Sequence, residues 1–225
     1  MLFTLKFYYG KISLVIKMYV IFDMDGTLLD TQKIYMPAWK WAGDIQGFSD
    51  MDKPALLLCG TNEVGWTNFL IENFPTLNIA KFKEDVEEYV TNNLEIKFKE
   101  GVKDTLDFLK EKGIKIGLAS GTGKDKALVR LNAVNALNYF DATVYGNEVE
   151  NGKPAPDIFL KAAKLLGAKP EECIVFEDSD NGIKSGFNAG MKVIGVPDVK
   201  PFTEDLKSML YAEFDRMDKA IKLFK

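Results

Sequence analysis

Two aspartates, Asp23 and Asp25, directly follow a short apolar stretch and are followed at once by a glycine, Gly26. Side chains two residues apart point the same way in extended backbone, so both carboxylates are expected on one side. Their mutual repulsion is unfavourable unless a cation or a chemical task offsets it. Gly26 permits a sharp turn that brings the backbone close to a ligand. The segment predicts a carboxylate-based reaction centre at a strand end.

A second acidic cluster, Glu177, Asp178 and Asp180, follows another apolar stretch. If the two apolar stretches form neighbouring strands, four or five carboxylates converge at one edge of a sheet. Hard oxygen ligands of this kind suit Mg²⁺ rather than zinc. The chain has no histidine, which excludes Ser-His-Asp and Cys-His catalysis and every His-ligated zinc site. Acid–base chemistry therefore falls to the remaining titratable side chains.

Two further segments have the character of phosphate-binding loops. Ser120, Gly121 and Thr122 follow a third apolar stretch, where a small hydroxyl and free backbone amides at a helix start suit an oxyanion. Lys153 lies in a loop that two prolines stiffen, which fixes where its ammonium group points. Each signal alone is weak, because serine and threonine are ordinary helix caps and most lysines are solvated.

The elements that must position these residues are short apolar runs separated by amphipathic stretches. The runs predict strands at residues 19–22, 114–119, 142–145, 173–176 and 192–196. Helices between strands imply right-handed crossovers and a parallel sheet with helices on both faces, an α/β Rossmann-like fold. Ligands gather at the carboxyl ends of such strands, and the first and fourth strands are expected to be neighbours.

About seventy residues separate the first two strands, which is far more than one crossover needs. Apolar residues recur at helical spacing there, enough for a small bundle with its own core. We expect an α-helical insert at residues 32–97, with the core formed by residues 18–31 and 98–225. Residues 1–17 are expected to be a non-native or poorly ordered extension, because Met18 directly precedes the first strand; an extra strand or a membrane-surface tether is the alternative.

Composition bounds the partners. The 225 residues carry a net charge of −4 without a long run of one sign, so no nucleic-acid partner is expected. No segment is long and apolar enough for a membrane span, and the N-terminal segment is a poor signal peptide. The two cysteines, Cys59 and Cys173, form no metal-binding or disulfide pattern. We therefore expect a cytoplasmic protein, and we expect it to be a monomer.

Four motifs, DMDGTLLDT, LASGT, GKPAPDIF and VFEDSDNGIKSGFNAGM, occur in this order at the ends of the predicted strands. Together they resemble the haloacid dehalogenase superfamily, and more narrowly its phosphoglycolate phosphatase and β-phosphoglucomutase-like branch. The resemblance extends over residues 18–225 and is weakest in the insert. It implies a helical cap domain inserted after the first strand, and a Mg²⁺-dependent phosphatase acting on a small phosphorylated metabolite.

The resemblance also implies a role for each residue of the motifs. Asp23 matches the nucleophile that becomes an aspartyl-phosphate, and Asp25 matches the general acid and base. The phosphate-binding positions are Ser120, Gly121 and Lys153. The metal positions are the Asp23 side chain, the Asp25 backbone carbonyl and Asp178, with Glu177 close by. In the cap, the substrate is expected to be chosen near Gly60, Thr61, Asn62 and Trp66.

The main alternative is a β-phosphoglucomutase-like mutase that uses the same core. The resemblance places a histidine and an arginine in the cap of such mutases, where this chain has Tyr35 and Glu63. An acidic residue there would repel a second phosphate, which favours hydrolysis. A haloacid dehalogenase and a non-catalytic binding protein are further alternatives. The resemblance implies one carboxylate and no metal for a dehalogenase, so Asp25 and the Glu177-Asp178 pair argue against that alternative. All the expected catalytic residue types are present, which argues against a non-catalytic protein. Sugar phosphates, phosphoglycolate and nucleoside monophosphates all remain open as substrates.

Overall fold

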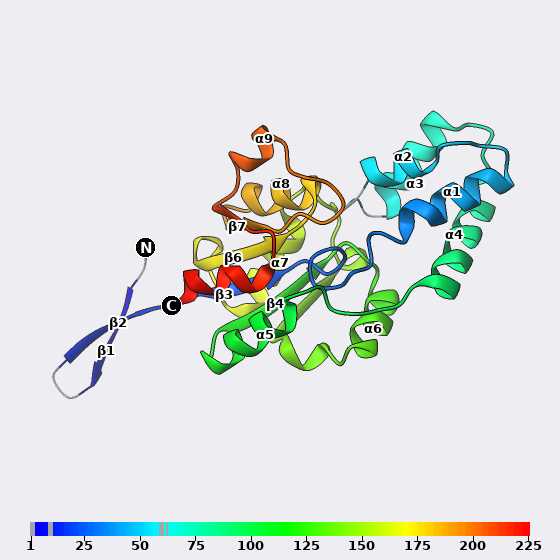
Figure 1. The fold of residues 1–225 in the computed structure, drawn as a ribbon. Helices are drawn as coiled ribbons and strands as arrows, with labels where there is room; N and C mark the ends of the chain where they lie inside the picture. The colour runs from blue at the N-terminus through cyan, green and yellow to red at the C-terminus, as the bar shows by residue number, and fades with distance from the viewer. Residues whose placement is uncertain (1–2, 9–10, 59–60, 62) are drawn as a thin grey trace.

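A computed structural model describes residues 3–8, 11–58, 61 and 63–225, and it places the candidate residues around one parallel sheet. The sheet has six strands in the order β5-β4-β3-β6-β7-β8 (Figure 1). The strands are β3 (Tyr19–Phe22), β4 (Lys115–Ser120), β5 (Ala142–Tyr145), β6 (Cys173–Glu177), β7 (Lys192–Gly195) and β8 (Ala212–Glu213). Five of them were predicted to within one residue at each end, whereas the short edge strand β8 was not. The predicted α/β parallel sheet is therefore confirmed.

The central strand β3 is buried along its whole length, as its continuous apolar sequence predicted. It pairs in parallel with β4 on one side and with β6 on the other, with Phe22 opposite Leu118 and Phe176. The expectation that the first and fourth predicted strands are neighbours is correct. The residues that follow Phe22 and Phe176 therefore meet at one edge of the sheet.

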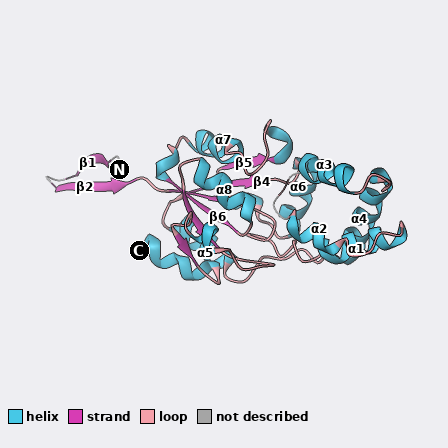
Figure 2. Ribbon diagram, turned by 90° about the horizontal axis from the view of Figure 1, so that it is seen from above, coloured by secondary structure: helices cyan, strands magenta, loops and turns pink. Residues whose placement is uncertain are grey.

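Helices cover both faces of the sheet (Figure 2). A separate hydrophobic cluster fills the space on each side. On one face Val20 and Phe22 pack with residues of α5, α6 and the 3₁₀ helix η4, and on the other Tyr19 and Ile21 pack with residues of α7, α8 and α9. The bounds are α5 (Val102–Glu111), α6 (Lys124–Ala133), α7 (Asp157–Leu166), α8 (Asp180–Asn188), α9 (Glu204–Lys207) and η4 (Met217–Phe224). Alternate residues of one strand thus supply both cores.

Four helices, α1 (Tyr35–Ile45), α2 (Asp52–Leu57), α3 (Glu63–Asn73) and α4 (Ile79–Asn93), form a helical unit at one end of the molecule (Figure 1). The unit has a hydrophobic cluster of its own, in which Trp39, Leu70 and Phe82 are buried. The two segments that join it to the sheet domain run side by side, since Asp30 N donates to Lys97 O at 3.1 Å and Lys99 N donates to Leu28 O at 2.9 Å.

The N-terminal strands β1 (Phe3–Tyr8) and β2 (Lys11–Ile16) pair with each other as an antiparallel hairpin. This hairpin is a sheet of its own, and in Figure 1 it extends from the side of the molecule away from the helical unit. Among the described residues, no helix has the length and apolar character that crossing a membrane requires.

Candidate active site

The strand ends place Asp23 in a buried contact with a lysine and a second carboxylate. Asp23 directly follows β3, and its backbone N–H donates to Phe176 O at 3.0 Å, which continues the β3–β6 pairing. The Lys153 Nζ atom lies 2.6 Å from Asp23 Oδ1 and 2.5 Å from Glu177 Oε1. All three side chains are buried, so the ammonium group is held between two carboxylates that come from neighbouring strands.

The electrostatics of this contact are set by burial. Burial raises the pKa of the Asp23 carboxyl to about 7, although the nearby Lys153 ammonium opposes that shift. Burial also raises the pKa of Asp178, and the charges of Glu177 and Asp23 add to the effect. For Lys153, burial acts to lower the pKa, but attraction to Asp23 and Glu177 outweighs it, so the pKa is raised and the group stays charged.

Three carboxylates, those of Asp23, Glu177 and Asp178, each offer an oxygen within 4.8 Å of the other two. Thr27 Oγ1 donates to Asp178 Oδ1 at 2.7 Å and thereby orients that side chain. Three buried carboxylates beside one ammonium group leave an excess of negative charge, which a divalent cation would offset. The all-oxygen donor set and the raised pKa values of Asp23 and Asp178 therefore fit Mg²⁺.

Glu177 has more partners than a simple metal ligand needs. Its Oε1 accepts from Lys153, while its Oε2 accepts from the backbone N–H groups of Asp178 and Ser179, both at 2.8 Å, and from Ser179 Oγ at 3.0 Å. Gly182 of α8 makes room for it, because a Cβ there would lie 1.7 Å from Oε1. Both oxygens thus accept hydrogen bonds from the protein, and through one of them Glu177 holds the Lys153 ammonium group within the acidic cluster.

The Asp25 carboxylate is not one of the three clustered acids. Its Oδ1 accepts from Thr31 Oγ1 and from Arg130 Nη1, each at 2.6 Å, and its Oδ2 accepts from Thr122 Oγ1 at 2.6 Å. Its backbone carbonyl accepts from Gln32 Nε2 at 3.1 Å. The side chain of Asp25 is thus held apart from the Asp23–Asp178 cluster, and the predicted metal contact concerns its carbonyl oxygen alone.

The predicted phosphate loop lies at the neighbouring strand end. Ser120 is the last residue of β4 and is buried, and its Oγ accepts from Thr122 N at 3.1 Å. Gly121 follows in the loop and lines the pocket described below. The carbonyl of Gly121 packs against Gly146, where a Cβ would approach it to 2.0 Å. The fold therefore brings Ser120, Gly121 and Lys153 to the sheet edge that carries Asp23, as the sequence predicted.

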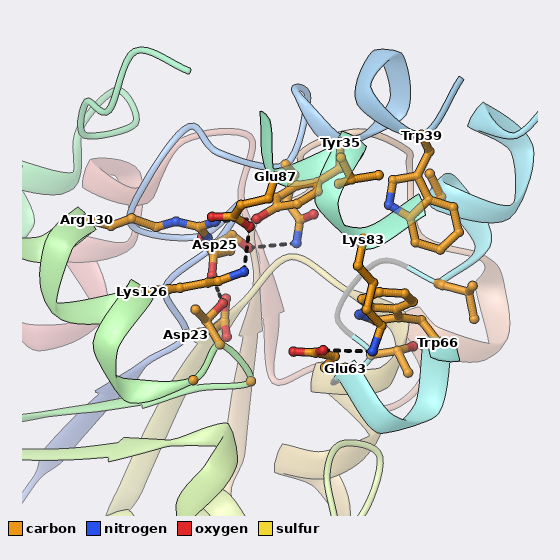
Figure 3. Close-up of a pocket in the computed structure, with 18 residues that line it drawn as sticks. Asp23, Asp25, Tyr35, Trp39, Glu63, Trp66, Lys83, Glu87, Lys126 and Arg130 are labelled. Atoms are coloured by element: carbon orange, nitrogen blue, oxygen red, sulfur yellow. Dashed lines mark hydrogen bonds and ion pairs between the residues drawn. The ribbon is translucent and has the colours of Figure 1, made fainter. Parts of the chain in front are cut away.

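A pocket lies between the sheet edge and the helical unit (Figure 3). The sheet domain lines it with Asp23, Asp25, Gly121, Thr122, Gly123, Lys126 and Arg130, and the residues of the insert add Gln32, Tyr35, Trp39, Ala55, Leu58, Thr61, Glu63, Trp66, Lys83, Val86 and Glu87. Of the four predicted cap residues, Thr61 and Trp66 line this pocket, whereas Gly60 and Asn62 lie outside the described residues. Asn181 Nδ2 donates to Thr61 Oγ1 at 3.0 Å across the two parts of the molecule.

Ion pairs occupy the wall of the pocket that the helical unit forms (Figure 3). Lys83 Nζ lies 2.9 Å from Glu63 Oε1 and 4.9 Å from the ring centre of Trp66. Lys126 of α6 reaches across to Glu87 of α4, with Nζ 2.5 Å from Oε2. The sequence prediction that Glu63 presents a negative charge is therefore incomplete, because a lysine from the next helix accompanies it.

Sequence reasoning gave no role to Arg130, Thr31 and Lys99, whose side chains contact residues of the loop after β3. Arg130 had a usable signal, because it falls on the apolar face of α6 with the buried residues Ala127 and Leu131. Thr31 ends the first motif but was not assigned a task. Lys99 had no signal in the sequence; its Nζ donates to Gly26 O at 2.5 Å and lies 3.0 Å from the buried Asp198.

Comparison with protein families places this arrangement among known proteins. Residues 20–196 match the model of the haloacid dehalogenase-like hydrolases. A phosphorylated carbohydrates phosphatase of Thermotoga maritima is 35% identical over 178 residues, which are 78% of this chain and 82% of that protein. The fructose-1-phosphate phosphatase YqaB of Escherichia coli is 32% identical over 182 residues, 79% of this chain and 95% of the relative.

Two further similarities come from a mutase and from a solved structure. A β-phosphoglucomutase of Bacillus subtilis is 31% identical over 196 residues, 81% of this chain and 84% of that protein. The crystal structure of a hydrolase from Pseudomonas syringae superposes with a TM-score of 0.80 at 23% identity, covering 92% of this chain and 98% of the other. The second similarity supports the fold alone.

Proposed function

This chain belongs to the haloacid dehalogenase-like hydrolases, and we propose that it is a Mg²⁺-dependent phosphatase of a small phosphorylated carbohydrate. Its class, phosphoric monoester hydrolysis, is that of its phosphatase relatives. The observation that carries the proposal is the buried contact of Lys153 with Asp23 and Glu177 beside Asp178. This contact places the candidate nucleophile Asp23 next to the Lys153 ammonium group, whose positive charge would attract a phosphate dianion.

The division of labour that we propose follows the separate hydrophobic clusters. Residues 18–31 and 98–225 form the core that performs the chemistry, and residues 32–97 form a helical cap over it. The separate cluster of the helical unit and the pocket between the two parts support this division. Movement of the cap on its two adjacent linkers would admit substrate and then exclude water during phosphoryl transfer.

The metal would be held by the carboxylates of Asp23 and Asp178 and by the Asp25 carbonyl oxygen. When bound, Mg²⁺ neutralises charge on the phosphate and on the surrounding carboxylates. Lys153 adds a second positive charge, and the Ser120 hydroxyl and Gly121 N–H would donate to the phosphate oxygens. These contacts offset the repulsion between a dianionic substrate and an anionic nucleophile.

In the first step, an Asp23 carboxylate oxygen attacks phosphorus and forms a new P–O bond. The bond from phosphorus to the ester oxygen breaks, and its electron pair stays on the leaving oxygen, which takes a proton from Asp25. The products are a free alcohol and an aspartyl-phosphate on Asp23. Covalent catalysis of this kind splits one difficult displacement into two easier ones.

In the second step, Asp25 takes a proton from a water molecule as the water oxygen attacks phosphorus. The bond from phosphorus to Asp23 breaks, inorganic phosphate leaves, and the Asp23 carboxylate is restored. One side chain thus acts as acid and then as base, which leaves it in its starting protonation state after each turnover.

The mutase alternative draws support from the relative in Bacillus subtilis. A sugar-phosphate mutase must bind a bisphosphate, which needs a second set of cationic groups in the cap. Here the Lys83 ammonium on the cap side of the pocket is already paired with the Glu63 carboxylate, and Tyr35 accepts a hydrogen bond from Arg130 where the resemblance places a mutase histidine. Both features favour hydrolysis.

Purified protein assayed with Mg²⁺ against a panel of sugar monophosphates tests the proposal, with fructose 1-phosphate included and phosphate release as the readout. We expect turnover that chelation with EDTA abolishes and Mg²⁺ restores. Asp23→Asn should retain the fold, as judged by circular dichroism, and lose turnover, because an amide is a poor nucleophile. Steady turnover by Asp23→Asn would exclude the covalent route. Full activity after exhaustive chelation would exclude the metal.

A further inference from the structure

The buried arginine of α6, Arg130, links the catalytic carboxylate to the helical unit. Its Nη1 donates to Asp25 Oδ1 at 2.6 Å, and its Nη2 donates to the Tyr35 hydroxyl. The guanidinium carbon lies 5.7 Å from the centre of the Tyr35 ring. Burying a guanidinium without hydrogen-bond partners is unfavourable. Because both terminal nitrogens of Arg130 have partners here, the orientation of its side chain is well fixed.

Asp25 receives its three side-chain donors from three separate parts of the chain. Thr31 belongs to the first linker, Thr122 to the loop after β4, and Arg130 to α6. The two threonines can rotate their hydroxyl groups to other acceptors, whereas the planar guanidinium fixes the direction from which it donates. Arg130 is therefore the donor that most restricts the orientation of the Asp25 carboxylate.

Tyr35 connects this arrangement to the cap. It is the first residue of α1, and the hydrogen bond from Arg130 joins residues 95 positions apart in the chain. Burial raises the pKa of the Tyr35 hydroxyl, so it remains a neutral phenol that can accept from the guanidinium. Rotation of the helical unit would carry Tyr35 away from Arg130. Of its two partners, Arg130 would then keep only Asp25.

We propose that Arg130 is a positioning residue that orients Asp25 for proton transfer, and that Tyr35 makes this orientation depend on the position of the cap. The inference rests on the proposed function, in which Asp25 must face the attacking water in the second step. Displacement of a proton-transfer group by about 1 Å lowers a rate by about 10²-fold. Arg130 itself need not contact the substrate.

Rapid-mixing kinetics with p-nitrophenyl phosphate and Mg²⁺ separate the two steps. The p-nitrophenolate group leaves without much help from an acid, so its release reports formation of the phosphoenzyme, and the steady state then reports hydrolysis. For Arg130→Met we expect kcat to fall about 10²-fold. KM should fall as well, because slow hydrolysis lets the phosphoenzyme accumulate. The initial burst should slow by less than about tenfold and approach one product per active site.

Three companion variants keep the test independent of misfolding. Arg130→Lys retains the charge and should recover part of the lost steady-state rate, while Tyr35→Phe should give a smaller loss of the same kind. Lys126→Met removes the other cation that α6 directs at the cap, one turn away, and leaves all donors to Asp25 in place. It should therefore not increase the ratio of burst rate to steady-state rate.

Two results would overturn the inference: an Arg130→Met enzyme with an unchanged steady-state rate, or one in which burst and steady-state rates fall equally. Equal losses would mean that Arg130 supports the fold or binds substrate. A wild-type protein that turns over no phosphate ester would instead reject the proposed function itself, before any variant is compared.

Discussion

The Glu177 carboxylate lies 2.5 Å from the Lys153 ammonium group, and the second oxygen of Glu177 is taken up by the turn that follows it. The residue is fully buried, so this geometry does not compete with solvent. We infer that Glu177 acts on the reaction through Lys153, whereas Asp178 acts through the metal. The two adjacent acids should then respond differently to substitution.

Substitution of each acid by its amide separates these roles. Glu177→Gln should lower kcat/KM about 10–100-fold, the range seen when the partner of a binding group is lost. The Mg²⁺ concentration for half-maximal activity should change little. Asp178→Asn should raise that concentration by about tenfold or more, because a metal ligand is lost. Magnesium titrations of both variants provide the measurement, and equal shifts would identify Glu177 as a direct ligand.

Stabilisation by Mg²⁺ should increase with pH. In the metal-free fold the pKa of Asp23 is about 7, above its unfolded value of 3.8, so the native state binds more protons than the unfolded chain between these values. Stability of the metal-free protein therefore falls as pH rises through this window. Because Mg²⁺ must displace the proton, the rise in Tm that it causes should be larger at pH 8 than at pH 5.5.

Thermal melts with and without Mg²⁺ at the two pH values measure this difference. Asp178→Asn provides the control, since its Tm should respond weakly to Mg²⁺ at both values. A wild-type Tm shift that is the same at both values, or larger at the lower one, would contradict a metal site built on Asp23.

A side chain at position 26 should be unfavourable for two separable reasons. The φ of Gly26, +84°, is unfavourable for other residues, and a Cβ would lie 2.2 Å from Asp178 Oδ2. Gly113 has a φ of +68°, but a Cβ added there would meet no heavy atom within 4 Å, so Gly113→Ala isolates the backbone effect. We expect Gly113→Ala to lower the free energy of unfolding by about 1–2 kcal/mol and to leave the activity unchanged. Gly26→Ala should lower the free energy of unfolding further and should also raise the Mg²⁺ concentration needed for half-maximal activity.

Chemical denaturation and Mg²⁺ titration of both alanine variants give the comparison. If Gly26→Ala were no less stable than Gly113→Ala and kept the wild-type Mg²⁺ requirement, the close packing of Gly26 against Asp178 would not matter for stability or for metal binding.

Glu63 should bias the enzyme against substrates with two phosphates. Its carboxylate pairs with Lys83 at 2.9 Å at the edge of the pocket. Glu63→Gln leaves Lys83 without that partner, so kcat/KM for fructose 1,6-bisphosphate should rise relative to fructose 1-phosphate. Because the pair is exposed, the gain should be about two- to fivefold and should shrink at high salt.

Activity toward p-nitrophenyl phosphate should stay unchanged in Glu63→Gln, because this small ester needs few contacts with the cap. Glu84→Gln removes an exposed charge from α4 that pairs with Lys81, and it serves as the matched control. An equal change toward all three esters would show that Glu63 affects folding or cap movement rather than selection.

Local patterns in the sequence were sufficient for the framework of this protein. Continuous apolar runs identified five of the six strands of the parallel sheet, because a strand buried on both faces has no polar side to present. The sequence also predicted that β3 and β6 are neighbours and that Asp23, Ser120, Lys153 and Asp178 gather at one edge. Parallel strands end at the same edge of the sheet, so residues that follow them at once meet there. Lys153 reaches that edge from the longer loop after β5.

The tertiary structure decided how those residues are held. Arg130 reaches Asp25 across 105 positions of the chain, and Thr27 reaches Asp178 across 151. No local pattern encodes such pairs, because the first depends on where α6 packs against the sheet and the second on the pairing of β3 with β6. The same holds for Lys83 beside Glu63 and for Lys99 beneath Gly26, which join separate segments. The motifs at the strand ends suffice to identify the family, whereas the direction of each side chain follows from the packing of distant elements.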